Sequence, residues 1–137
     1  MLRSMLDTNL CIRVLRDRTS ALRARFNAEV SGLSIRTIAL TELLHGAARS
    51  ARPAANRAGV EDFAARLDVP DFDAEAAAHA PDITATLHAT GQPIGACDVL
   101  IAGHARRRGL IVVTGNLAEF RRVAGFRCED WLAGGQP

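Results

Sequence analysis

Short runs of apolar residues, each bounded by polar residues or glycine, predict a sheet made of short strands. The clearest is the β-branched run at residues 110–113, which lies between Gly109 and Thr114. A continuous apolar run of this length is typical of a parallel strand that is buried on both faces. Four weaker runs predict further strands at residues 2–6, 33–37, 67–69 and 126–131.

Longer segments between these runs repeat apolar residues three and four positions apart, which predicts helices. They cover residues 20–30, 38–50, 54–67, 73–90 and 96–108, and Thr8 and Asn9 resemble residues that begin another helix. Pro81 lies inside the fourth segment, so a kink or a break is expected there. Gly109 is expected to end the last helix. Strands that alternate with helices indicate an α/β domain with a mainly parallel sheet.

The composition fits one folded domain. The chain has 137 residues, of which 48% are hydrophobic, and a formal net charge of +2. A hydrophobic fraction this high with so small a net charge excludes a disordered chain. The small positive charge is only a weak argument for a nucleic-acid partner. We expect one domain at residues 1–131 and a tail at 132–137, without a membrane span because no apolar run reaches the required ~20 residues. Three widely spaced cysteines without a C-x-x-C pair favour a reducing cytoplasm over a disulfide framework.

Polar residues suited to chemistry follow the predicted strands or begin the helices beside them. Asp7 ends the first strand, Asp98 lies in the first turn of the helix at 96–108, and Asn116 and Glu119 follow the strand at 110–113. Glu42 lies in the second turn of a helix among apolar neighbours. Because ligands of open α/β sheets bind beyond the carboxyl ends of the strands, these side chains are candidates for one site.

Each of these acids also has an ordinary structural interpretation. Asp7 could cap the following helix, Asp98 could complement a helix N-terminus, and Glu42 and Glu119 could be surface charges. If the acids converge, carboxylates about 5 Å apart repel by roughly 3 kcal/mol at an effective dielectric of 20. Mg²⁺ or Mn²⁺ would remove that repulsion, because both prefer oxygen ligands. One or two such ions activate water and stabilise charge when a phosphodiester is cleaved.

Other chemistries find little support in the sequence. The four histidines have no H-x-x-x-H or H-E-x-x-H spacing, which disfavours zinc. The chain lacks a phosphate-binding loop, a dinucleotide-binding motif and a nucleophile elbow. A receiver or phosphatase domain with Asp7 as the phosphate acceptor is a further alternative, although the D-x-D-x-T of such a phosphatase is missing.

Five segments spread over nearly the whole chain form an ordered set of motifs. They are LDTN at 6–9, TELLHGAARS at 41–50, IGACDVLIAGHARRRGL at 94–110, VTGNLAEF at 113–120 and CEDW at 128–131. In this order they resemble the PIN-domain ribonucleases of the VapC toxin type. The resemblance implies an α/β fold in which a mostly parallel, short-stranded sheet is flanked by helices and carries an acidic pocket at the strand ends.

The resemblance also implies an activity and the residues that perform it. Proteins of this type are Mg²⁺- or Mn²⁺-dependent endoribonucleases that act as toxins in type II toxin–antitoxin pairs. By matching motif, Asp7, Glu42 and Asp98 would be the metal-binding acids. Asn116 and Glu119 would lie at the fourth position of the catalytic site.

One residue departs from the pattern of the most similar subgroup. That subgroup often reads T-N-N-x-x-E-F, whereas Gly115 here replaces the first amide. Thr114 would be the hydroxyl that orients groups beside it, and either Asn116 or Glu119 would complete the pocket. Because the subgroup includes toxins that cut the anticodon loop of initiator tRNA, that loop is a candidate substrate.

Partners follow from the same resemblance. Arg13, Arg16 and Arg106 are candidate contacts to the RNA backbone, although cations at a helix C-terminus such as Arg106 also have a purely structural use. We expect a VapB-type antitoxin protein that neutralises the toxin, and a homodimer. The alternative function is a PIN-like module that binds RNA or protein without catalysis.

Overall fold

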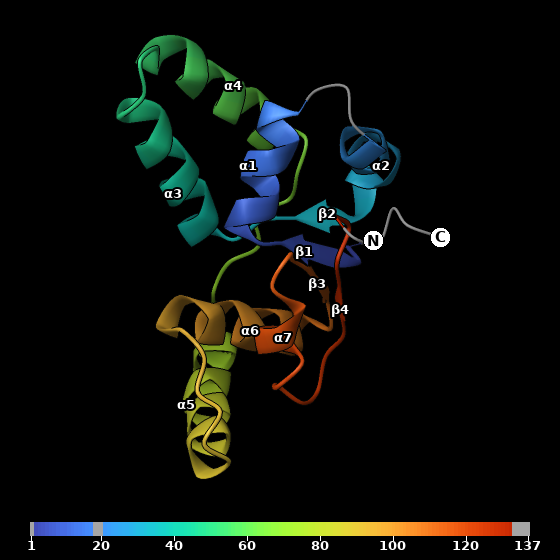
Figure 1. Cartoon of the computed structure of the whole chain (residues 1–137), viewed down its shortest axis with the longest axis vertical. Coiled ribbons are helices and arrows are strands. Elements are labelled where there is room, and N and C mark those ends of the chain that lie inside the picture. The colour runs from blue at the N-terminus through green and yellow to red at the C-terminus, as the bar shows by residue number, and fades with distance from the viewer. Residues whose placement is uncertain (1, 18–20, 133–137) are drawn as a thin grey trace.

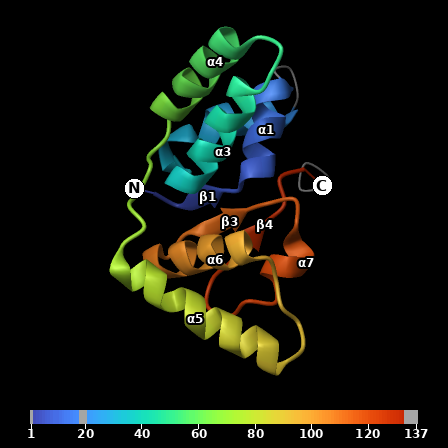
Figure 2. The same cartoon turned by 90° about the vertical axis from the view of Figure 1, so that its left-hand side faces the viewer.

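The chain forms a parallel sheet covered by helices on both faces. The computed structural model describes residues 2–17 and 21–132. Its four-stranded sheet has the order β2-β1-β3-β4, and every pairing is parallel (Figures 1 and 2). The strands are β1 (Ser4–Leu6), β2 (Leu33–Ser34), β3 (Ile111–Val113) and β4 (Cys128–Glu129). The predicted α/β class with a mostly parallel, short-stranded sheet is confirmed.

Two groups of helices enclose this sheet. The helices are α1 (Thr8–Arg16), α2 (Ala21–Glu29), α3 (Thr37–Ala48), α4 (Pro53–Ala65), α5 (Ala74–Ala89), α6 (Ala96–Arg108) and α7 (Leu117–Phe120), with a 3-10 turn at Val30–Gly32. Figure 2 shows α1, α3 and α4 on one side of the sheet and α5 and α6 on the other. Within the described residues, no helix has both the length and the hydropathy needed to cross a membrane.

Alternate residues of the central strands enter two separate cores. Leu6 of β1 and Val113 of β3 pack with apolar residues of α1 to α4. Met5 and Val112, their neighbours in the same strands, pack with α5 and α6. All four side chains are fully buried. Since successive side chains of a strand point to opposite faces, burial on both sides explains why these strands appear in the sequence as continuous apolar runs.

Two expectations were wrong in detail. The strand predicted at 67–69 is reduced to an isolated parallel bridge between Ser34 and Asp68. Its partner strand β2 ends at Ser34, and α3 begins soon afterwards at Thr37. At Pro81 a kink or a break was predicted, and there is no break, since α5 continues through Pro81. Pro81 and Ala77, one turn earlier, are both exposed, so the carbonyl that loses its helical donor can bind water.

Several predicted boundaries are confirmed. The helix at 96–108 has the expected ends, and Gly109 follows it in the left-handed conformation with φ 67° and ψ 32°. The three cysteines are free. The predicted start of a helix at Ser20 lies outside the described residues, as does the predicted tail at 132–137 apart from Leu132.

Candidate active site

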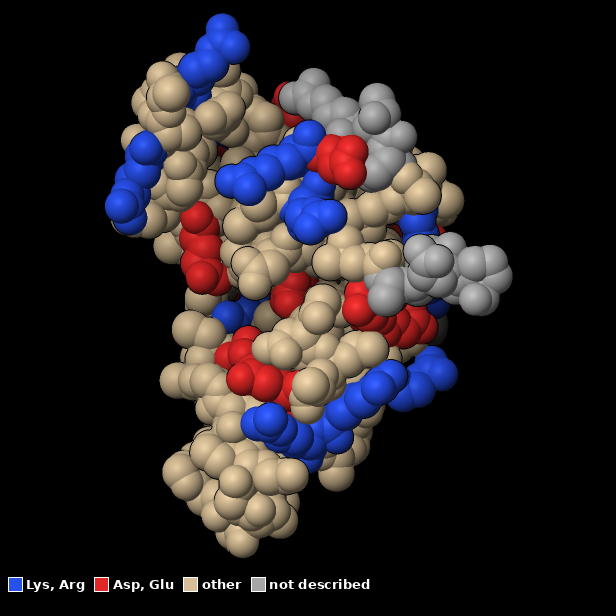
Figure 3. All heavy atoms as spheres, in the orientation of Figure 1, with Lys and Arg blue, Asp and Glu red and all other residues tan. Residues whose placement is uncertain are grey.

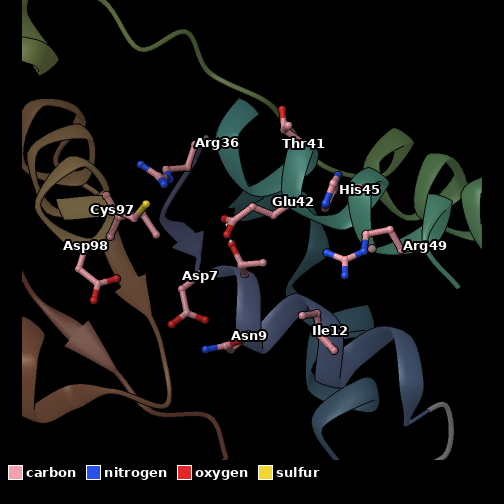
Figure 4. Close-up of a pocket in the computed structure, with 13 residues that line it drawn as sticks. Asp7, Asn9, Ile12, Arg36, Thr41, Glu42, His45, Arg49, Cys97 and Asp98 are labelled. Atoms are coloured by element: carbon pink, nitrogen blue, oxygen red, sulfur yellow. Dashed lines mark hydrogen bonds between the residues drawn. The ribbon is translucent and has the colours of Figure 1, made fainter. Parts of the chain in front are cut away.

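A pocket of about 740 Å³ opens at the carboxyl end of the sheet, between α1, α3 and α6 (Figure 4). Asp7 reaches it from the end of β1, Glu42 from α3 and Asp98 from α6. The lining residues are Asp7, Thr8, Asn9, Ile12, Arg36, Thr41, Glu42, His45, Gly46, Arg49, Cys97, Asp98 and Ile101. The three acids that the sequence predicts as metal ligands therefore line one cavity, although they come from distant segments.

Asp7 is the most constrained of the three acids. Its Oδ1 accepts a hydrogen bond of 2.9 Å from the backbone N–H of Leu10 and so caps α1. Its own N–H donates to the carbonyl of Val113 at 3.0 Å, which continues the pairing of β1 with β3. Thr114, the residue after β3, donates its hydroxyl to Oδ2. These contacts hold the carboxylate in one orientation at the pocket wall.

The charge of Asp7 is only partly compensated by the protein. Burial raises the pKa of this carboxyl, and the hydrogen bonds from Thr114 and Leu10 oppose that rise. The carboxylates of Asp130 and Glu42 raise the pKa further by repulsion. The net shift is upward, which is the behaviour of a buried acid that lacks a cation partner.

Asp98 is perturbed more strongly and in the same direction. Burial is the main cause that raises the pKa of Asp98 to about 7, followed by a side-chain hydrogen bond with Glu119 and repulsion from Glu119 and Asp7. Glu119 in turn accepts a hydrogen bond of 3.0 Å from the amide of Asn116, whose backbone N–H donates to Thr114 Oγ1 at 2.9 Å. Asn116 and Glu119 thus lie beside the pocket and connect Asp98 to the hydroxyl that orients Asp7.

Glu42 is more exposed and is held by a single described contact. It projects from the second turn of α3, and Thr8 Oγ1 donates to its Oε1 at 2.7 Å. Thr8 is the first residue of α1. The start of α1 therefore positions two of the three acids, Asp7 as its cap and Glu42 through a hydroxyl.

The donor set has the chemistry of a hard-cation site, although it is not preassembled. In the part of the chain that the structure describes, no three acid, histidine or cysteine side chains form a ready metal-ligand cluster. Burial and mutual repulsion nevertheless raise the pKa values of Asp7 and Asp98. A divalent cation would lower both values, because a nearby positive charge favours the ionised carboxylate.

The predicted RNA-contacting arginines occupy two kinds of position. Arg13 and Arg16 are exposed on α1. Arg106 is partly buried, and its guanidinium donates to His79 Nδ1, Asp82 Oδ2 and the carbonyl of Ala124 at 2.8–3.1 Å. These internal acceptors join α6 to α5 and to the loop before β4, so the predicted RNA contact of Arg106 gains no support from its surroundings.

Charge is arranged unevenly around the pocket. Figure 3 shows acidic side chains gathered about the hollow in the middle of this face, with basic atoms also inside the hollow and further arginines above and below it. A polyanion that crossed this face would meet repulsion at the hollow and attraction at its edges. The net charge of +2 gives no indication that acidic and basic side chains occupy different parts of this face.

Sequence reasoning missed two basic residues that line the pocket, Arg36 and Arg49. Arg36 lies at the end of a predicted strand, as Asp7 does. The candidates named at strand ends were acidic and amide residues, so this arginine was not among them. Arg49 lies two turns after Glu42 at a spacing of seven residues, which places it on the same face of the helical pattern. Both signals were present in the sequence.

Comparisons with known proteins agree on the family. The PIN domain family model matches residues 4–126. The tRNA(fMet)-specific endonuclease VapC of Shigella flexneri is 48% identical over 131 residues, and its namesake from Salmonella typhimurium is 49% identical; each match covers 96% of this chain and 99% of the relative. The crystal structure of DNA-bound VapBC from Salmonella typhimurium contains a chain with a TM-score of 0.89 at 49% identity, over 96% of this chain and 99% of that chain. The protein therefore belongs to the PIN-domain family and, within it, to the VapC ribonucleases.

Proposed function

We propose that this protein is a metal-dependent endoribonuclease toxin that hydrolyses phosphodiester bonds in RNA. The observation that carries the proposal is the convergence of Asp7, Glu42 and Asp98 on one pocket from three elements. We assign Mg²⁺ or Mn²⁺ binding to these three acids. Asn116 and Glu119 would complete the catalytic site through their contacts with its other members.

Each group of this pocket has a defined task in the proposed reaction. The metal, when bound, supplies the positive charge that activates a water and stabilises charge on the phosphate. Thr114 keeps Asp7 oriented, and Thr8 does the same for Glu42. Asp98, with a pKa of about 7, would have to be deprotonated to hold the metal, because metals bind the ionised carboxylate.

We propose tRNA as the substrate, with the anticodon loop of initiator tRNA as the target. Two relatives at 48% and 49% identity are named tRNA(fMet)-specific endonucleases. A loop suits an open pocket because its bases can be splayed out and its backbone can approach the acids. Arg13 and Arg16 are proposed to hold the RNA backbone, since both are exposed on the helix that Asp7 caps.

We further propose that a VapB-type antitoxin neutralises this activity and that the toxin forms a homodimer. The similar structure from Salmonella typhimurium is of a VapBC pair. An arginine from the antitoxin would pair well with a pocket lined by carboxylates. Adding the antitoxin to active protein should abolish RNA cleavage, and light scattering should give twice the mass of one chain.

The decisive experiment compares cleavage of initiator tRNA by wild-type protein and Asp7→Asn, each with Mg²⁺ and with EDTA. Asparagine is as good a helix cap as aspartate, so this variant removes the charge and leaves α1 intact. We expect cleavage only by the wild type with Mg²⁺. Asp62→Asn, which changes an exposed acid on α4, is the matched control and should cleave normally. Equal background cleavage in all samples would favour a non-catalytic PIN-like binding module.

A further inference from the structure

Arg36 is a buried cation that faces the acidic pocket. It directly precedes α3 at the carboxyl end of the sheet and is only 2% exposed. Figure 4 shows its side chain extending into the space between α3, which carries Glu42, and α6, which carries Cys97 and Asp98. A charged side chain with so little contact with water has to be satisfied by a partner inside the protein or by a ligand.

The described residues supply no hydrogen-bond partner for two of its three nitrogens. The Nε and Nη1 atoms of Arg36 are buried and make no hydrogen bond there, and none of the described ion pairs includes this guanidinium. Glu42 and Asp98 act on it only as nearby charges. Since buried polar groups in folded proteins are nearly always hydrogen-bonded, two unpaired donors at a pocket wall indicate that a ligand completes them.

The chemistry of the donors selects the ligand. A guanidinium presents its N–H groups in a rigid planar fork that matches the oxygens of a phosphate. The three carboxylates of the pocket repel the RNA backbone, and Arg49 is the other arginine among its lining residues. A buried guanidinium that the fold holds in place also stabilises negative charge that develops during reaction, with little reorganisation.

We propose that Arg36 is a further catalytic residue, whose guanidinium donates to a non-bridging oxygen of the RNA phosphodiester held in the pocket. This inference rests on the proposed function, because it requires RNA at this site. It assigns to Arg36 a role that differs from the role of the acids, which bind the metal. The positive charge of Arg36 would attract the RNA phosphate and repel the metal ion. Removal of Arg36 should therefore weaken RNA binding and leave metal binding unchanged or tighter.

The first test is the single-turnover rate of initiator tRNA cleavage at saturating Mg²⁺. We expect Arg36→Gln to lower the rate by about 10²- to 10³-fold, the loss typical of one electrostatic donor to a reacting group. Arg36→Lys keeps the charge but loses the fork, so its rate should lie between those of the wild type and Arg36→Gln. Arg57→Gln, which removes an exposed arginine paired with Glu61 on α4, is the matched control and should cleave at the wild-type rate.

The second test separates phosphate contact from a structural role. In an Asp7→Asn background, which blocks cleavage, Arg36→Gln should make the dependence of log K for RNA on log salt shallower by about 0.7, the value for one lost contact to a single strand. Calorimetry with the otherwise wild-type protein should show that Arg36→Gln keeps or tightens Mn²⁺ binding. The thermal midpoint should not fall through lost hydrogen bonds, because Nε and Nη1 have none to lose; a fall with unchanged Mn²⁺ binding reports only the lost packing of the longer side chain.

The outcomes distinguish this inference from the function on which it rests. A wild-type protein that cut no RNA would overturn both. Normal cleavage by Arg36→Gln, or an unchanged salt dependence, would overturn the role of Arg36 alone. A joint loss of Mn²⁺ binding and thermal stability in Arg36→Gln would also overturn it, in favour of a structural role. If Arg36→Gln did not fold, a wild-type rate for Arg36→Lys would still reject the phosphate contact.

Discussion

At the scale of single residues, Asp7 serves local structure and the proposed chemistry with the same carboxylate. Oδ1 caps α1 by accepting from Leu10, while Oδ2 accepts from Thr114 at the pocket. From sequence the cap and the site were alternative interpretations of Asp7. The two oxygens make them compatible, because each is engaged by a different element.

Thr114 provides a test of how Asp7 is tuned. Thr114→Val removes the hydroxyl that lowers the pKa of Asp7 and leaves the N–H of Asn116 without its acceptor. We expect the acid limb of the pH–rate profile of RNA cleavage to move to higher pH. The free energy of unfolding should fall by about 1–3 kcal/mol, because the buried Oδ2 of Asp7 loses its donor. Thr114→Ser retains the hydroxyl, so it should keep the pH profile and lose only the packing of one buried methyl group, about 1 kcal/mol; an equal shift of the profile in both variants would contradict the assignment.

Asp98 makes the stability of the metal-free protein depend on pH. Its pKa is about 7 in the folded protein, against about 3.9 for aspartate in an unfolded chain. A raised folded pKa contributes stability that is fully present below about pH 4 and is lost as the pH rises through about 7. In urea unfolding with EDTA, the free energy of unfolding of Asp98→Asn should therefore rise relative to that of the wild type between pH 5 and pH 8. A difference that stays constant over this range would contradict the raised pKa.

The candidate site was predictable where it depends on local position and unpredictable where it depends on distant contacts. Asp7 and Asp98 follow from a strand end and a helix start. The burial of Arg36 and the pairing of Arg106 with Asp82 depend on how separate elements pack. Local patterns do not encode those contacts, so arginines that look alike in sequence have different surroundings in the fold.

At the scale of elements, α5 and α6 owe their close packing to two features of α6. At Gly103 an added Cβ would lie 3.3 Å from both the carbonyl oxygen of Ala76 and Cβ of His79, so glycine lets the helices approach. One turn later, Arg106 hydrogen-bonds His79 and pairs with Asp82 of α5. The sequence predicted both helices but not their contact.

Gly125 tests the importance of the Arg106 contacts. It has φ +94°, and a Cβ there would lie 2.7 Å from Cδ of Arg106. We expect Gly125→Ala to lower the free energy of unfolding by about 1–3 kcal/mol through backbone strain and displacement of that arginine.

The control for this prediction is Gly59→Ala in α4, where an added Cβ meets nothing within 4 Å. It should raise the free energy of unfolding by about 0.5–1 kcal/mol, the advantage of alanine over glycine inside a helix. Urea denaturation measures both variants. A stabilising effect of Gly125→Ala would contradict both the strain and the clash with Arg106.

Element boundaries followed the sequence best where backbone chemistry is local. The ends of α6 depend on Gly109 and on a continuous helical pattern, and both were predicted. The length of a strand depends on its partners, so the apolar run at 67–69 could not reveal that β2 stops at Ser34 and leaves only a bridge. The continuation of α5 through Pro81 likewise depends on which face of the helix meets water.

At the scale of the whole molecule, two cores share one sheet. The core beside α1 to α4 and the core beside α5 and α6 both include residues of β1 and β3. We therefore expect the predicted domain at 1–131 to unfold in one cooperative transition. Near-ultraviolet and far-ultraviolet circular dichroism should report the same urea midpoint, and the calorimetric and van't Hoff enthalpies should agree. Two resolved transitions would show that the cores fold independently.

The pairing of β1 with β3 has a consequence for how the site can fail. In the described part of the chain, three residue pairs define the register of β1 and β3. They are Ser4 with Ile111, Met5 with Val112 and Leu6 with Val113. A slip by one residue would exchange Met5 and Leu6 between the cores and carry Asp7 away from Thr114. Misalignment would thus destroy packing and chemistry together. A variant that keeps the register of β1 and β3 should therefore keep Asp7 at the pocket.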